Sequence, residues 1–194
     1  MAPAKTVFFE CDMQQALFPY LYNAETLEHN GVRLTQTSQI LDIPVIATTQ
    51  VRGGKISDKI TAKHHAGVRV FEGKFQFSMM TPELDAHFKS LARDTVVLYG
   101  AEAHICILQT ALDLIERGIN VFVVVDACTS MQVQDRNVSL AAMQAAGVHL
   151  TTFQAVVFEL VRGVDHKKFK QFLPLLKASA DPKKPLDLAS QPKL

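Results

Sequence analysis

The sequence predicts an α/β fold with three layers: a doubly wound, mostly parallel sheet of six strands in the order 3-2-1-4-5-6, with helices on both faces. Short β-branched or aromatic runs alternate with longer stretches in which apolar residues recur at three-and-four spacing. Two of the runs, 96–99 and 121–125, are apolar on consecutive residues, as expected for central strands covered on both faces. Right-handed crossovers then place strand 1 beside strand 4, with a crevice at their carboxyl ends.

Each element follows from a local pattern. The Thr81-Pro82 pair is typical of a helix start, and Gly118 and Gly147 are typical helix stops. The stretch 52–67 is the one long connection inside the core and is expected to form a wall of the pocket. The strands are predicted at 6–11, 44–50, 68–71, 95–99, 120–126 and 148–152, and the helices at 24–41, 82–92, 103–117, 134–146, 153–161 and 166–178.

Length, charge and composition restrict the class of protein. The 194 residues predict a single domain over 1–194, in which 179–194 form a flexible or partner-packed tail. A net charge of +1 argues against a nucleic-acid partner. No apolar run reaches the roughly 18 residues of a membrane span. Three cysteines fit a reducing compartment, so the expected location is the cytoplasm, and Pro192-Lys193-Leu194 is only a weak match to a peroxisomal signal.

Three residues that could carry chemistry lie near the carboxyl ends of predicted strands. Asp12 ends strand 1, Lys74 follows strand 3, and Cys106 lies just inside the helix after strand 4, where a helix start stabilises a thiolate. Each has a structural alternative: a turn residue for Asp12, a surface lysine for Lys74 and buried packing for Cys106. Because parallel strands deliver their carboxyl ends to one edge of the sheet, the three are expected to converge there.

The remaining titratable residues are interpreted as structural. Cys11 precedes Asp12 and is expected to point to the opposite face, and Cys128 is expected to pack in the core. Glu10 alternates with Asp12 on a buried strand, so it is expected in a buried polar network. His64-His65 is expected in a surface loop.

No pattern in the sequence indicates a cofactor or a metal. The residues after strand 1, Cys11-Asp12-Met13-Gln14-Gln15, contain no glycine, which argues against a phosphate-binding loop. No third ligand is spaced for zinc beside the two adjacent histidines. We therefore expect neither a cofactor nor a metal.

Four sequence blocks carry a resemblance to a known family over residues 7–178. The sequence resembles the isochorismatase-like cysteine hydrolase superfamily, in particular its branch of small isochorismatase-domain-containing proteins. The blocks are Phe8-Phe9-Glu10-Cys11-Asp12-Met13-Gln14, Pro44-Val45-Ile46-Ala47-Thr48-Thr49-Gln50, Lys74-Phe75-Gln76-Phe77-Ser78-Met79, and residues 96–106, which continue through 109–111 to Asp126-Ala127.

The resemblance implies a mechanism. It implies a triad in which Asp12 accepts the thiol proton, Lys74 stabilises charge, and Cys106 attacks a carbonyl carbon to form a thioester. It also implies an oxyanion hole made by the backbone N–H groups of Glu102 and Cys106, and a cis peptide bond between Ala101 and Glu102. The implied activity is hydrolysis of a small amide or related carbonyl compound.

The sequence also departs from this family. Thr49-Gln50-Val51-Arg52 lacks the Asp-x-His pair of metal-dependent nicotinamidases, and the presence of Cys106 argues against vinyl-ether hydrolysis. The common Ser-Ser-Arg after strand 5 is replaced by residues 128–132, so a carboxylate-binding arginine is missing there, and Arg136 and Arg52 are the nearby substitutes.

The substrate is expected to be a small molecule, and the chain is expected to form a homo-oligomer, at least a dimer. Alternatives are a non-catalytic interaction protein and an RNA-processing protein, for which the lysines near the C-terminus are the only support. The predicted pocket residues are Phe18, Gln50, Phe75, Phe77 and His104, with Tyr20 and Tyr22 nearby. The predicted interface residues are Phe169, Phe172, Leu173, Leu175 and Leu176.

Overall fold

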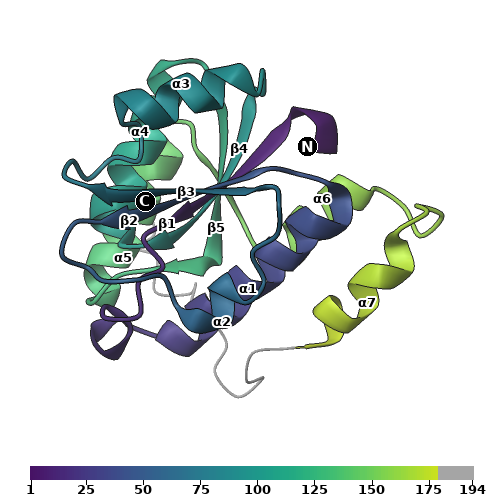
Figure 1. Ribbon diagram of the computed structural model, residues 1–194, viewed down its shortest axis with the longest axis horizontal. Helices are drawn as coiled ribbons and strands as arrows, with labels where there is room; N and C mark the ends of the chain where they lie inside the picture. The colour runs from purple at the N-terminus through teal and green to yellow at the C-terminus, as the bar shows by residue number, and fades with distance from the viewer. Residues whose placement is uncertain (179–194) are drawn as a thin grey trace.

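The computed structural model describes residues 1–178, and its centre is a six-stranded sheet in the order β3-β2-β1-β4-β5-β6 (Figure 1). All neighbouring strands pair in parallel, which confirms the predicted topology. The strands are β1 (Thr6–Cys11), β2 (Val45–Gln50), β3 (Val68–Lys74), β4 (Thr95–Ala101), β5 (Asn120–Thr129) and β6 (His149–Thr151).

The principal helices lie where the apolar periodicity predicts them. They are α1 (Ala24–Leu41), α3 (Pro82–Ser90), α4 (Leu108–Glu116), α5 (Val133–Ala145), α6 (Phe153–Val161) and α7 (Phe169–Lys177). A π-helical turn, η3 (Ala103–Ile107), precedes α4. The sequence analysis missed the short elements η1 (Pro3–Lys5), η2 (Phe18–Tyr20) and α2 (Asp58–Thr61), because three or four residues are too few to show a period.

The alternation of side chains along β1 divides the core into two layers. Phe9 packs with α3, α4 and α5 on one face, whereas Phe8 packs with α1, α6 and α7 on the other. Both phenylalanines are fully buried. A third, smaller cluster, which includes Met13 and Ile60, closes the core below the carboxyl edge of the sheet. These layers hold the carboxyl ends of β1, β3 and β4 in fixed positions.

A buried polar network surrounds Glu10, as the sequence predicts. The carboxylate is fully buried and accepts hydrogen bonds from the hydroxyls of Thr35, at 3.1 Å, and Tyr99, at 3.2 Å. The Nε2 atom of His64 lies 3.1 Å from the other carboxylate oxygen. His65 contacts the Ser38 hydroxyl at 2.9 Å. The two histidines lie in a loop, as predicted, but their side chains are half-buried and supply partners for polar groups inside the protein.

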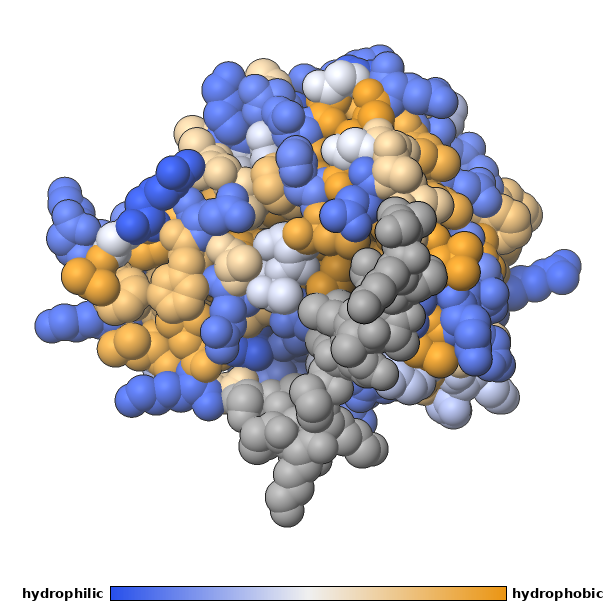
Figure 2. Space-filling view, turned by 180° about the vertical axis from the view of Figure 1, so that it is seen from behind, coloured by the Kyte–Doolittle hydropathy of each residue, from blue (hydrophilic) through white to orange (hydrophobic). Residues whose placement is uncertain are grey.

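The last helix packs mainly on its own chain. Phe172 is fully buried and Leu175 is 9% exposed, while Phe169 and Leu176 pack against the same apolar cluster, and Leu173 is the exposed member of the five. The apolar surplus on α7 is thus used to cover the sheet. Figure 2 shows apolar side chains gathered at the end of the molecule where α7 lies.

Two predicted features belong to the C-terminal segment. The tail at 179–194 and the terminal Pro192-Lys193-Leu194 lie outside the described residues. Within residues 1–178, no helix is long and apolar enough to span a membrane.

Candidate active site

Asp12, Lys74 and Cys106 come together at the carboxyl edge of the sheet. Lys74, the last residue of β3, places its Nζ atom 2.8 Å from Asp12 Oδ2 and 3.5 Å from Cys106 Sγ. The side chains of Lys74 and Asp12 are 2% and 1% exposed, so this ion pair is shielded from water. The three residues are 62 and 32 positions apart in the chain. The parallel sheet is what brings them into contact.

Lys74 is held by more than its two charged neighbours. Its ammonium donates to Gln50 Oε1 at 2.6 Å and to the backbone carbonyls of Phe77, at 2.8 Å, and Gln76, at 3.3 Å. Burial by itself lowers the pKa of Lys74. Its interactions with the Asp12 carboxylate and with the two neighbouring cysteine side chains outweigh burial and raise the pKa. The lysine therefore remains a cation at neutral pH.

Asp12 is the first residue beyond β1, and its side chain is oriented by its own backbone conformation and by a hydroxyl of β2. Its φ of 48° lies in the left-handed region, which aspartate tolerates better than most residues. Thr48 donates its hydroxyl to Asp12 Oδ1 at 2.8 Å, while Asp12 Oδ2 faces Lys74. Both oxygens of the carboxylate are thus fixed.

Cys11 lies beside this group, which corrects the expectation that it points away from it. The Cys11 sulfur, an Asp12 oxygen and the Cys106 sulfur all lie within 4.8 Å of one another. Strict alternation holds only while the backbone stays extended, and the left-handed φ of Asp12 turns that carboxylate to the side that Cys11 already faces. Burial raises the pKa of the Cys11 thiol well above its usual value.

Cys106 is positioned by the start of the helix after β4. It lies in η3, and its backbone carbonyl accepts the Thr110 hydroxyl at 2.6 Å. The peptide bond between Ala101 and Glu102 is cis, at the position that the family resemblance implies. Both of these residues line the same cavity as Cys106. Cys106 is 7% exposed and lines this cavity, so a small molecule in the cavity can reach it.

The cavity at Cys106 has a volume of about 260 Å³, near the lower end of the range for small-molecule sites. Of the predicted pocket residues, Gln50 and Phe77 line it. The lining residues are Asp12, Gln14, Leu17, Gln50, Val51, Arg52, Gly53, Phe77, Ala101, Glu102, Ile105 and Cys106.

The other predicted pocket residues lie elsewhere. Phe75 is 83% exposed, and its contribution is a backbone carbonyl that accepts Gln50 Nε2 at 3.0 Å. Phe18 packs against the small apolar cluster around Met13. His104 points to the Ser130 hydroxyl, 3.0 Å from Nδ1, and towards Asp135. The aromatic wall predicted from the sequence is therefore reduced to Phe77 among the cavity residues.

Gln14 was missed by the sequence analysis. Its amide donates to the backbone carbonyls of Gln50, at 3.1 Å, and Gly54, at 2.6 Å, and its Oε1 accepts the backbone N–H of Gln50 at 2.8 Å. Gln14 therefore ties the loop after β1 to the end of β2 and holds Gln50 against Lys74. The only signal available in the sequence was an amide side chain three residues beyond the end of β1, and its complete burial is seen only in the structure.

The two candidate arginines differ in their roles. Arg136 is 2% exposed and donates to the backbone carbonyls of Cys128, at 2.8 Å, and Val125, so it supports β5. Arg52 lines the cavity, and within residues 1–178 it makes no hydrogen bond or ion pair to another side chain. Its guanidinium is the cation available to a ligand.

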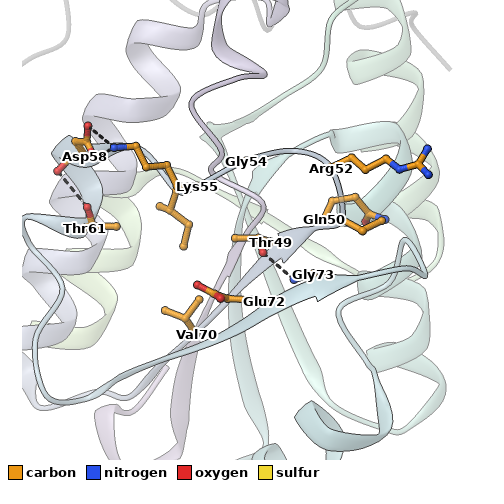
Figure 3. A pocket seen from close by; sticks show the side chains of 12 residues that line it. Thr49, Gln50, Arg52, Gly54, Lys55, Asp58, Thr61, Val70, Glu72 and Gly73 are labelled. Atoms are coloured by element: carbon orange, nitrogen blue, oxygen red, sulfur yellow. Dashed lines mark hydrogen bonds and ion pairs between the residues drawn. The ribbon is translucent and has the colours of Figure 1, made fainter.

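A second cavity of about 500 Å³ lies on the other side of residues 50–52 and is bounded by β2, β3 and α2 (Figure 3). Figure 3 shows Lys55 directed to Asp58, and Glu72 and Val70 rising from β3. Arg52 extends away from these groups, on the Gln50 side. The segment 50–52 therefore separates the two cavities.

The group Cys11, Asp12 and Cys106 is also the one cluster within residues 1–178 whose atoms could share a metal ion. Two thiolates and a carboxylate suit a thiophilic cation such as Zn²⁺. In the structure the positive charge beside them is the Lys74 ammonium. The site therefore balances its negative charges with a side chain.

Comparisons with known proteins show the family of this chain. A family model described as "Isochorismatase domain" matches residues 6–155. The "Isochorismatase domain-containing protein 1" of Salmo salar is 39% identical over 181 residues, which cover 93% of this chain and 64% of the relative. The "Isochorismatase domain-containing protein 2" of Rattus norvegicus is 35% identical over 175 residues, which cover 90% and 82% of the two chains. The chain thus spans less than two thirds of the salmon relative.

Solved structures share the fold. The structure described as "MAR1 Ribonuclease" from Caenorhabditis elegans has a TM-score of 0.88 and 35% identity, covering 96% of this chain and 97% of that chain. The YcaC gene product of Escherichia coli is described as an octameric hydrolase of unknown specificity. Its structure has a TM-score of 0.77 and 22% identity, and the match covers 84% of this chain and 82% of that chain. The second likeness is one of fold alone.

Proposed function

Because this chain belongs to the isochorismatase-domain family, we propose that it is a hydrolase that cleaves a small amide or related carbonyl compound through a thioester on Cys106. The observation that carries this proposal is the contact of the Lys74 ammonium with both Cys106 Sγ, at 3.5 Å, and the Asp12 carboxylate, at 2.8 Å. A buried cation beside a thiol stabilises the thiolate, and the adjacent carboxylate can accept the proton that the thiol loses.

The proposed reaction has two stages. Asp12 takes the Cys106 proton, and the thiolate attacks the carbonyl carbon to form a tetrahedral oxyanion, for which the backbone N–H groups of Glu102 and Cys106 are the proposed donors. The C–N bond breaks, and the nitrogen leaves as an amine or ammonia after taking the proton from Asp12. Water then adds to the thioester, with Asp12 as the base, and releases the acid and the thiol.

The cavity restricts the substrate. A volume of about 260 Å³ admits a small molecule. Arg52 lines this cavity without a side-chain partner among the described residues, so a substrate that carries an anionic group near the scissile bond gains a favourable interaction there. A small amide with a carboxylate is the proposed class.

The test combines covalent labelling with turnover. Wild type, Cys106→Ala and the control Cys128→Ala are compared for mass increase with iodoacetamide and for release of ammonia from a panel of small amides, ureides and hydroxamates. Labelling and turnover that are lost only in Cys106→Ala support the proposal. A native protein whose Cys106 remains unlabelled contradicts it and favours a non-catalytic interaction protein with the same fold.

A second candidate function comes from one comparison. The Caenorhabditis elegans protein that covers 96% of this chain carries the description "MAR1 Ribonuclease", so RNA processing is the alternative. The net charge of +1 offers little attraction to a phosphate backbone. RNA binding measured between about 50 and 200 mM salt decides between the two functions, because phosphate contacts give a steep loss of affinity with salt.

We also propose that the chain associates with copies of itself. The Escherichia coli YcaC product is described as octameric, and several large apolar side chains of this chain are exposed, including Phe75, Val164 and Phe158. Exposed apolar side chains that form a contiguous patch mark an interaction surface. The proposed state is a homo-oligomer, at least a dimer.

A further inference from the structure

We propose that Cys11 is a modification site: when a peroxide oxidises Cys106, Cys11 forms a disulfide bond with it and reversibly blocks that sulfur. The proposal concerns the reactivity of Cys106 as a thiol and can be tested without a substrate, so it stands apart from the amide-hydrolase proposal.

The geometry places the two sulfur atoms next to each other. Cys11 ends β1 and Cys106 lies in η3, and their Sγ atoms are within 4.8 Å of one another. A disulfide needs about 2.05 Å between the sulfurs, a gap that side-chain rotation and a small shift of η3 can close. Cys128, the third free cysteine, is buried after β5 and is not part of this cluster.

The two cysteines differ in accessibility. Cys106 is 7% exposed and lines the 260 Å³ cavity, so a molecule as small as hydrogen peroxide can reach it. Cys11 is fully buried behind it. Cys106 is therefore the sulfur that meets the oxidant first, and Cys11 can react only with a group formed on Cys106.

The charges around the two sulfurs also favour oxidation of Cys106 before Cys11. The Lys74 ammonium donates to Cys106 Sγ at 3.5 Å and stabilises a thiolate there. Burial keeps the pKa of Cys11 well above its usual value, so Cys11 stays a protonated thiol. Its sulfur does not compete for the oxidant, and its proton has an acceptor in the neighbouring Asp12 carboxylate.

The disulfide forms in two steps. The Cys106 thiolate attacks one oxygen of hydrogen peroxide, the O–O bond breaks, and a sulfenic acid and hydroxide form. Cys11 loses its proton to Asp12 and attacks the sulfenic sulfur, and the S–S bond forms as hydroxide leaves and is protonated to water. Two thiols give up two electrons in total, and one peroxide becomes two waters.

The consequence is protection of Cys106. A sulfenic acid without a thiol beside it is oxidised further to a sulfinic acid, which ordinary thiols do not reduce. A disulfide with Cys11 diverts the sulfenic acid into a form that dithiothreitol restores. Oxidised wild type is thus expected to be inert to thiol reagents at Cys106 and to recover fully on reduction.

The experiment treats the full-length protein with hydrogen peroxide, blocks free thiols with N-ethylmaleimide and measures intact mass and tryptic peptides. After the mass of any maleimide adduct on Cys128 is subtracted, wild type and Cys128→Ala are each expected to be about 2 Da lighter than the reduced chain and to yield a peptide pair joined through Cys11 and Cys106. Cys11→Ala is expected to gain about 32 Da at Cys106 and to regain less than a tenth of its iodoacetamide reactivity after dithiothreitol.

Two results would overturn the proposal. One is wild type that accumulates the sulfinic acid with no joined peptide, and the other is Cys11→Ala that recovers its reactivity as completely as wild type. If Cys11→Ala does not fold, the wild-type peptide map decides alone. Failure of the amide screen would leave this outcome unaffected, because no readout depends on turnover.

Discussion

The Lys74 ammonium connects the charged groups at the carboxyl edge of the sheet. It lies 2.8 Å from the Asp12 carboxylate and 3.5 Å from the Cys106 sulfur, and its pKa is raised. A single side chain therefore pairs with the carboxylate and contacts the sulfur that we propose as the nucleophile. Its removal should affect both partners at once.

We expect Lys74→Met to lower the rate of Cys106 alkylation by iodoacetamide at pH 7 by at least tenfold, about 1.4 kcal/mol. The methionine keeps the aliphatic length but leaves the thiolate without its cation. Alkylation is followed by intact mass, with Lys55→Met, on the exposed side of the second cavity, as the control. A Lys74→Met rate within tenfold of the wild-type rate would contradict the assigned role.

Arg52 can be tested with two reagents that differ in charge. Iodoacetate and iodoacetamide transfer nearly isosteric groups to the same sulfur, and only iodoacetate is an anion. We expect Arg52→Gln to lower the ratio of the iodoacetate rate to the iodoacetamide rate by about three- to tenfold, the size expected for a partly solvated charge pair.

The matched control for this measurement is Lys55→Gln. It removes one positive charge from the neighbouring cavity, where Lys55 already pairs with Asp58 at 2.8 Å. Its reagent ratio should equal that of wild type. Equal ratios in wild type and Arg52→Gln would show that the cavity does not use Arg52 to attract anions.

At the scale of secondary-structure elements, the close approach of β1 and β4 shapes the site. Gly100 has a φ of 129°, and a Cβ atom at that position would lie 1.9 Å from the backbone oxygen of Cys11. Only glycine permits this approach. It also directs the chain from β4 into the cis peptide bond and on to Cys106.

Gly100→Ala is therefore expected to lower the free energy of unfolding by more than about 3 kcal/mol. Gly118→Ala is the control, because its φ of 73° is also left-handed but no atom lies within 4 Å of the added carbon. Its cost should be about 1 kcal/mol. Urea unfolding measures both, and equal costs would exclude the backbone contact as the cause.

The joint between β5 and α6 depends on Asp126. Its carboxylate accepts the backbone N–H of Phe153 at 2.8 Å. Burial raises the pKa of Asp126, although hydrogen bonds and the charges of Arg33 and Arg136 act in the opposite direction. The folded protein thus holds this proton more tightly than the unfolded chain does.

The raised pKa of Asp126 determines whether its contribution to stability rises or falls with pH. The contribution of Asp126 to stability is greatest below its unfolded pKa of about 3.9 and is lost as the pH rises through the folded value. The unfolding free energy of wild type minus that of Asp126→Asn should therefore fall between about pH 4 and pH 7. Urea unfolding at several pH values tests this, with the exposed Asp165→Asn as the control. A difference that grows with pH would contradict the prediction.

At the scale of the whole molecule, the property to be tested is the oligomeric state in solution. The chain has a mass of 21.5 kDa, and we expect light scattering after size exclusion to give at least twice that value. A single peak at the monomer mass over a range of concentrations would contradict self-association.

Most of the fold could be predicted from the sequence, and part of the site could not. The consecutive apolar residues of β4 and β5 and the helical periods between strands are local patterns, and the structure confirms the elements and the strand order that they predict. The predicted meeting of Asp12, Lys74 and Cys106 followed from that order. The positions of Phe75 and His104 did not follow, because Phe75 lies in a loop and His104 in a short π-helical turn, and neither segment has a period that fixes side-chain direction.

The sequence by itself determined the layers and which strand ends meet, since periodicity and connection rules act along the chain. Only the tertiary structure decided what surrounds those ends. A left-handed turn at Asp12 brings Cys11 beside Cys106, and Gln14 holds Gln50 against Lys74. Such contacts depend on dihedral angles and on atoms from distant segments, and neither can be read from residue spacing.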